Sequence, residues 1–154
     1  MGRPFTITRT TTISAMPQVI HGLVDDFHEW VKWSPWEDLD PALERSYSGP
    51  ERGIGAHYAW KGNRKAGEGS MEITGLAPDA VDIDLRFLQP WQATNTVRLE
   101  LSPTRTGTEV TWTMHGEHVG FMGLVSRVMP LDKMLGKDFE KGLARLRAVA
   151  EQTS

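Results

Sequence analysis

Hydrophobic and polar residues alternate with a period of two along much of the first 116 residues. Such alternation is typical of β-strands that bury one face and expose the other. The clearest example is the segment 81–87, in which Val81, Ile83, Leu85 and Phe87 alternate with charged residues. Glycine, proline and asparagine mark turns between the segments. The pattern predicts seven strands, at residues 5–13, 43–48, 55–61, 69–75, 81–87, 95–101 and 110–116.

Helical spacing replaces the alternation after the first strand. Ser14 followed by Pro17 predicts a helix start, with the serine as cap and the proline in the first turn. The apolar positions of this helix form one stripe, made of Ile20, Leu23, Val24 and Phe27. A second short helix is predicted to carry Trp30, Val31 and Trp33. Both are too short to be stable alone, so we expect them to pack on another element.

Residues 119–154 predict one long helix with two unlike halves. The back half has an apolar stripe at three- and four-residue steps, made of Leu131, Leu135, Phe139, Gly142, Leu143, Leu146 and Ala150. The front half is almost entirely apolar around Arg127. Pro130 separates the halves and is expected to kink the helix or to start a new one. The front half either packs as ordinary core or forms the roof and gate of a cavity.

The order of these elements predicts a single α+β domain over residues 1–154. Strands joined by short turns are antiparallel neighbours, so the segments from residue 43 onward form a meander. A sheet with one apolar face needs a cover, and the chain supplies two short helices and one long one. A length of 154 residues is sufficient for one core.

Composition narrows the classes of function. The net charge is −3 and the basic residues are scattered, which argues against a nucleic-acid-binding surface. Cysteine is absent, so this chain has no disulfide, no thiolate nucleophile and no cysteine-ligated metal. The first residues lack the apolar run of a signal peptide, and no segment approaches the length of a membrane span. We therefore expect a cytoplasmic protein with no stable membrane insertion.

Signatures of catalysis and of metal binding are largely missing. The sequence has no phosphate-binding glycine loop and no nucleophile elbow. His115 and His118 would point to opposite sides of a strand, which does not suit a shared metal ion. The acidic loop containing Glu37, Asp38 and Asp40 lacks the ligand spacing of a calcium site. We predict no metal and no cofactor.

Aromatic and methionine side chains give the strongest functional signal. They come from separate segments, but their positions in the alternation of each strand should point them to one concave face. This face should lie beside the front half of the long helix. Small-molecule pockets are mostly apolar, with a few polar groups that orient the ligand. Asn95 and Arg9 are polar residues with inward parity, and each needs a partner in the protein or in a ligand. The predicted ligand-binding residues are Trp33, Trp36, Tyr58, Trp60, Met71, Phe87, Asn95, Trp112, Met114, Met122, Val125 and Met129.

Several motifs resemble those of the START-like (SRPBCC, Bet v 1-like) superfamily, and most closely its bacterial polyketide cyclase/dehydrase-like branch. They cover nearly the whole chain and comprise the opening strand, Trp33-Ser34-Pro35-Trp36-Glu37, Asp40-Pro41, Gly53-Ile54-Gly55-Ala56, Tyr58-Ala59-Trp60, Gly67-Glu68-Gly69-Ser70-Met71, Thr111-Trp112-Thr113-Met114-His115-Gly116 and Gly136-Lys137-Asp138-Phe139-Glu140-Lys141-Gly142-Leu143. The resemblance implies the helix-grip fold, in which a curved antiparallel sheet wraps around the long C-terminal helix and encloses an elongated cavity. Members of such families bind hydrophobic ligands, carry lipids or act on aromatic polyketides.

Three functions remain open at this stage. The first is the binding of a small hydrophobic molecule, lipid-like or polyketide-like, between the sheet and the long helix. The second is a cyclase or dehydratase that uses the same cavity, with Tyr58, Asn95 and Glu117 as catalytic candidates. The third is a partner-binding or stress-response module, and a homodimer is compatible with any of the three.

Overall fold

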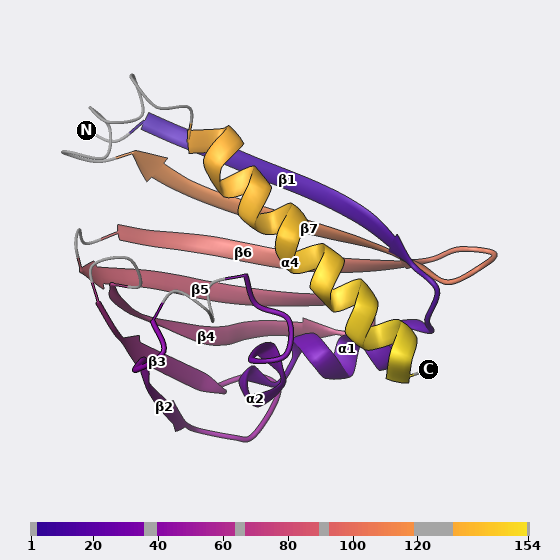
Figure 1. The fold of residues 1–154 in the computed structure, drawn as a ribbon, viewed down its shortest axis with the longest axis horizontal. Coiled ribbons are helices and arrows are strands. Elements are labelled where there is room, and N and C mark those ends of the chain that lie inside the picture. The colour runs from indigo at the N-terminus through magenta and orange to yellow at the C-terminus, as the bar shows by residue number, and fades with distance from the viewer. Residues whose placement is uncertain (1–2, 36–39, 64–66, 90–92, 119–130, 154) are drawn as a thin grey trace.

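The computed structural model describes residues 3–35, 40–63, 67–89, 93–118 and 131–153. Seven strands form one antiparallel sheet in the order β1-β7-β6-β5-β4-β3-β2 (Figure 1). The first strand therefore pairs with the last, and the remaining strands follow as a meander. Their bounds are β1 Arg3–Ile13, β2 Glu44–Ser48, β3 His57–Lys61, β4 Glu68–Ala77, β5 Ala80–Gln89, β6 Ala93–Pro103 and β7 Thr108–His118.

The predicted alternation is confirmed on the central strands. Ile83 and Leu85 of β5 are buried, whereas Asp82 and Asp84 lie on the outer face. Val97 and Leu99 of β6 and their neighbours on β7 continue the same apolar face. Burial of this face is the main source of stability that a sheet of this kind offers.

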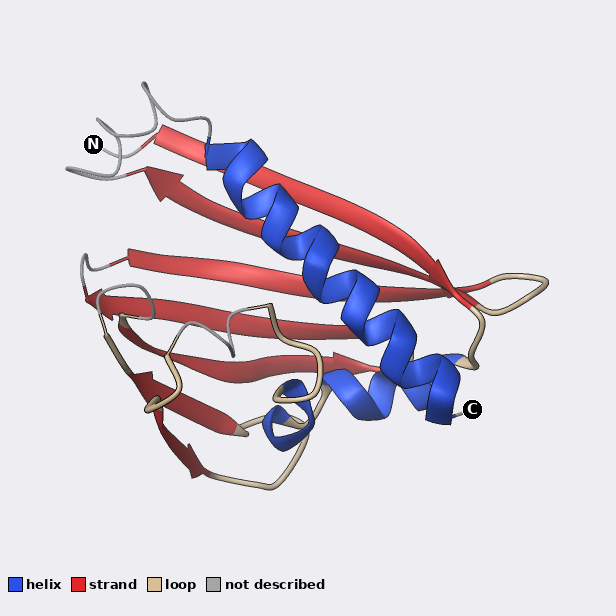
Figure 2. Cartoon of the chain, in the orientation of Figure 1, coloured by secondary structure: helices blue, strands red, loops and turns tan. Residues whose placement is uncertain are grey.

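Within the described residues, the helices that lie on the concave side of the sheet are α1 (Pro17–Val24), α2 (Phe27–Trp30) and α4 (Leu131–Thr153) (Figure 2). The α4 helix crosses the sheet diagonally, and its C-terminal part lies close to α1. It begins at Leu131, directly after the proline that was predicted to divide the helical segment. The predicted apolar stripe is confirmed where side chains are described, because Leu135 is half-buried and Phe139, Gly142, Leu143, Leu146 and Ala150 are buried.

The start of α1 differs from the prediction. Met16, not Ser14, occupies the N-cap position, and Pro17 is the first helical residue. The backbone N–H of Ser14 instead donates a hydrogen bond of 2.9 Å to Glu151 of α4. The proline determines the start because its ring fixes φ and it has no N–H to leave unpaired. Ser14 thus links the end of β1 to the last helix.

One predicted side-chain direction on β4 is also wrong. The alternation predicted that Gly75 shares the inner face with Ile73. A register shift between these residues makes Ile73 pair with Ile83 and Gly75 pair with Asp82, which faces outward. The irregularity is a β-bulge, and an extra residue reverses the faces beyond it.

The front half of the predicted long helix, residues 119–130, lies outside the described residues, so its role as roof or gate remains a prediction. None of the helices that the structure describes is both long and apolar enough to cross a membrane.

Candidate ligand-binding site

The cross-strand register arranges the inner-face residues in rows that run across the sheet. One row reads Phe5, Gly116, Asn95, Leu85, Met71 and Tyr58, from β1 to β3. The next row, nearer the sheet's end, reads Ala93, Phe87, Gly69 and Trp60. We call these two rows the open end, because Phe5, Phe87 and Trp60 are only partly buried. Five of the predicted ligand-binding residues, Tyr58, Trp60, Met71, Phe87 and Asn95, lie in these two rows.

Aromatic rings contact one another along the β3 side of the open end. Trp60 meets Phe87 edge-on at a centroid distance of 5.9 Å and stacks with Tyr58 at 6.1 Å. Gly69, between Trp60 and Phe87, lies under the indole ring, and a Cβ at this position would be 2.6 Å from the ring. The glycine therefore allows Trp60 to lie against the strand, which agrees with the general role of strand glycines at close approaches.

Asn95 lies in the middle of the open end. Its neighbours on the adjoining strands are Leu85 and Gly116, and Phe5 follows on β1. The Asn95 side chain reaches over Gly116, because a Cβ on this glycine would collide with Oδ1. Asn95 is 5% exposed, and no hydrogen bond of its carboxamide is found among the described residues. Its amide atoms are not among the fully enclosed unpaired polar atoms of the described residues.

Two other predicted residues, Trp33 and Trp112, lie in a different environment. Trp112 stacks on Phe139 of α4 with a centroid distance of 4.4 Å and meets Trp33 edge-on at 5.6 Å. The indole N–H of Trp33 donates to the carbonyl of Leu23, and that of Trp30 donates to Val24. We call these four rings, Trp30, Trp33, Trp112 and Phe139, the packed end, because none is more than 3% exposed.

The remaining predicted residues divide into two groups. Met114 is buried in the row next to the open end, opposite Ile7 and Val97. Glu117 is part of β7 and pairs with Pro4, but its side chain lies outside the described part of the structure. Three residues of the helical segment and one tryptophan also lie outside it, namely Met122, Val125, Met129 and Trp36. Their roles remain predictions.

Arg9, the second polar residue with inward parity, has its partners within the protein. Its Nε lies 3.4 Å from a carboxylate oxygen of Glu140, and its Nη1 donates to the carbonyl of Thr8 at 2.8 Å. The guanidinium also lies against Gly136 of α4. Arg9 thus connects β1 to α4, and its charge is balanced by that of Glu140.

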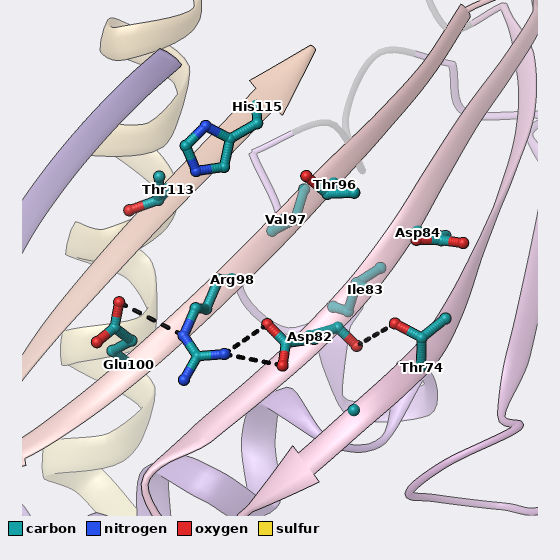
Figure 3. Close-up of a pocket in the computed structure, with 11 residues that line it drawn as sticks. Thr74, Asp82, Ile83, Asp84, Thr96, Val97, Arg98, Glu100, Thr113 and His115 are labelled. Atoms are coloured by element: carbon teal, nitrogen blue, oxygen red, sulfur yellow. Dashed lines mark hydrogen bonds and ion pairs between the residues drawn. The ribbon is translucent and has the colours of Figure 1, made fainter.

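A hollow of about 390 Å³ lies on the opposite, outer face of the sheet, over β4 to β7 (Figure 3). Arg98 donates from Nη1 to both carboxylate oxygens of Asp82 at 2.9 Å, and its Nε lies 3.5 Å from Glu100. The hydrogen bonds to Asp82 raise the pKa of Arg98 above its ordinary value. Arg98 thus offsets part of the negative charge of Asp82 and Glu100, and the hollow lies on the face of the sheet opposite the aromatic rows.

Metal chemistry has no support in the described residues, because no three His, Asp or Glu side chains among them are grouped to hold an ion. The sequence analysis missed Gly69, Gly116 and the half-buried Phe5 as parts of the open end. A signal was present, since glycines at inward positions of predicted strands mark places where another group approaches the backbone.

A family model described as "Polyketide cyclase / dehydrase and lipid transport" matches residues 4–151. A search of curated protein sequences found no match. Among solved structures, the Aha1 dimer from Colwellia psychrerythraea is 18% identical, with a TM-score of 0.66, and the match covers 96% of each chain. Major latex-like protein 151 from Panax ginseng is 13% identical, with a TM-score of 0.68, over 97% of this chain and 99% of that one.

The di-domain ARO/CYC protein BexL, from the BE-7585A biosynthetic pathway, is a third structural relative. It is 14% identical with a TM-score of 0.73, and the match covers 96% of this chain and 50% of BexL. At these identities the likeness concerns the fold, which is the helix-grip, Bet v 1-like architecture.

Proposed function

Because this chain belongs to the polyketide cyclase/dehydrase and lipid transport family, we propose that it binds a small hydrophobic molecule, aromatic or lipid-like, at the open end of its concave face. In this proposal the ligand lies between the sheet and the C-terminal helical segment. Trp60 and Phe87 contact its apolar body, and Tyr58 and Met71 form the floor beside them.

One observation carries the proposal: the aromatic rings of the open end are incompletely covered. Trp60 and Phe87 pack on the core yet keep part of their surface exposed, whereas the rings of the packed end are fully enclosed. Aromatic surface left accessible on a concave face gains free energy when an apolar ligand covers it. Pockets with this lining are the usual sites of small-molecule binding.

The cyclase or dehydratase alternative rests on the description of BexL and on the family description. It would need polar groups that act on one reacting region. Tyr58 and Asn95 share a row but are separated by β4 and β5, which at about 4.8 Å per strand places their backbones roughly 14 Å apart. This separation favours binding over proton transfer by these two groups together.

The partner-binding alternative requires a large exposed apolar patch. The exposed large hydrophobic residues of the described part are Met16, Val31, Tyr47, Ile54, Leu76 and Leu88. Exposure of these residues alone does not define one continuous apolar patch, so it does not favour the partner-binding alternative over ligand binding.

Titration of the protein with 2-naphthol and with 1-dodecanol tests the proposal. Indole N–H signals in ¹H–¹⁵N spectra, assigned from single Trp→Phe variants, report which tryptophan is affected. We expect the Trp60 signal to shift and the Trp33 signal to stay unchanged, because Trp33 is enclosed and hydrogen-bonded. Trp60→Ala should weaken binding about tenfold, since one aromatic contact contributes roughly 1–1.5 kcal/mol.

Leu88→Ala is the matched control, because it removes an apolar side chain from the outer face next to Phe87. Its affinity should equal that of the wild type. If neither probe shifts the Trp60 signal, or if both variants weaken binding equally, the open end is not the binding site.

A further inference from the structure

Asn95 is a buried polar group surrounded by apolar side chains and glycine backbone. Leu85 and Gly116 flank it on the neighbouring strands, and Val97 follows it on the same face of β6. A carboxamide carries two N–H donors and an acceptor oxygen. No hydrogen bond of these groups is found among the described residues, and the residue is 5% exposed.

Gly116 gives this side chain the space that it occupies. Any larger residue at position 116 would collide with Asn95 Oδ1 and with the ring of Phe5. The amide therefore lies above the backbone of β7, in the same row as Tyr58 and next to the row of Phe87 and Trp60. A polar group in this position faces the space in which the proposed ligand lies.

Among the described residues, the two arginines Arg9 and Arg45 are either paired or distant from Asn95. Arg9 lies toward the packed end and is paired with Glu140. Arg45 is exposed on the edge strand β2, four strands away from β6. A ligand carboxylate or phosphate beside Asn95 would thus be buried without a described cation near it, which is strongly unfavourable.

We propose that Asn95 determines specificity: it selects, among apolar molecules, those that carry an uncharged oxygen, a hydroxyl or a carbonyl. This inference rests on the proposed function and identifies the polar part of the ligand. The carboxamide donates to a carbonyl or accepts from a hydroxyl, and in doing so gains the partner that it lacks in the free protein.

Three probes of similar shape test the inference: 2-naphthol, 2-methylnaphthalene and 2-naphthoate. In calorimetric or NMR titrations, we expect the wild type to bind the naphthol at least about fivefold more tightly than the methyl compound, and the carboxylate most weakly. Asn95→Leu and Asn95→Ala should abolish the preference for the naphthol while retaining binding of 2-methylnaphthalene. Thr96→Val, on the same strand but on the outer face, is the control and should leave all three affinities unchanged.

Thermal unfolding provides an independent readout. Asn95→Leu should melt at the same temperature as the wild type or higher, because it removes an amide that has no partner in the free protein. A lower melting temperature for this variant, or an unchanged preference for 2-naphthol in both Asn95 variants, would overturn the role of Asn95 while leaving the binding of apolar ligands intact. A wild type that binds none of the three probes would overturn the proposed function and this inference with it.

Discussion

The two ends of the concave face use the same residue types for different purposes. At the packed end, the rings of Trp112 and Phe139 lie parallel, and the neighbouring indoles donate hydrogen bonds to helix carbonyls. At the open end, Trp60 and Phe87 are half-buried, and Gly69 of the intervening strand β4 lies between them. In the described structure, aromatic rings at one end are enclosed by helices, whereas those at the other end keep accessible surface.

This difference indicates that aromatic content alone does not locate a binding site. What distinguishes the two ends is whether the faces of the aromatic rings are already covered inside the protein. The rings of the packed end are enclosed and should contribute stability, and the open end is where the proposed ligand would bind. Substitutions matched across the two ends test this distinction.

The largest effect is expected from Trp112→Ala. It removes a ring that is 1% exposed and stacked on α4, so the free energy of unfolding should fall by about 3–5 kcal/mol. Trp60→Ala, at the half-buried end, should cost only about 1–2 kcal/mol. Urea denaturation measures both values. Equal losses would mean that the two ends are packed alike.

A smaller contrast is expected between two glycines of α4. A Cβ at Gly142 would lie 2.8 Å from Pro35 and 3.0 Å from Trp112, so Gly142→Ala should destabilise the protein by about 1–2 kcal/mol through overpacking. A Cβ at Gly136 would meet only the end of the Arg9 side chain, which can move aside. Gly136→Ala should therefore be neutral or stabilising by up to about 1 kcal/mol, since alanine favours the helix.

Chemical denaturation of these two variants gives the comparison directly. A loss of stability in Gly136→Ala as large as that in Gly142→Ala would show that Arg9 is held as firmly as the packed rings are.

The smallest of these effects depends on pH and concerns Asp26, which caps α2 beside the packed end. Burial raises the pKa of Asp26, but hydrogen bonds from the ring and backbone of His28 and from Arg52 outweigh it, and the pKa lies below its ordinary value. The carboxylate therefore stabilises the fold fully above the unfolded-state pKa of about 3.9, and this stabilisation is lost as the pH falls through the folded-state value.

Asp26→Asn should accordingly cost about 1 kcal/mol at pH 7, with the difference from wild type shrinking as the pH falls through the lowered folded-state pKa. Denaturation curves at several pH values test this, with Asp84→Asn on the outer face as the control. A difference that stays constant down to low pH would assign the effect to the shape of the cap and not to its charge.

The alternation of residue types predicted the fold well because parity determines which face of a strand a side chain occupies. The alternation could not predict which inner-face residues of neighbouring strands lie opposite one another. Trp112 and Asn95 both point to the inner face, but the pairing of β6 with β7 places Trp112 opposite Leu99, whereas the side chain of Asn95 lies over Gly116. That register depends on contacts between distant segments, so the separation of the packed end from the open end required the structure.

Local signals failed where a backbone constraint outweighed a side-chain preference. Ser14 is a good helix cap by type, but the position of Pro17 moved the start of α1 to Met16. The bulge in β4 likewise moved Gly75 to the outer face. The proline was a signal in the sequence, whereas the bulge depends on the pairing of β4 with β5.

The pairing of β1 with β7 has a consequence for biosynthesis. Residues 3–13 are synthesised before their partners, residues 108–118. The threonine-rich segment must stay unpaired until those residues have been made, and closing so long a loop is entropically costly and slow. Folding should therefore be late and concerted, with the N-terminal strand joining the sheet only once the seventh strand is available.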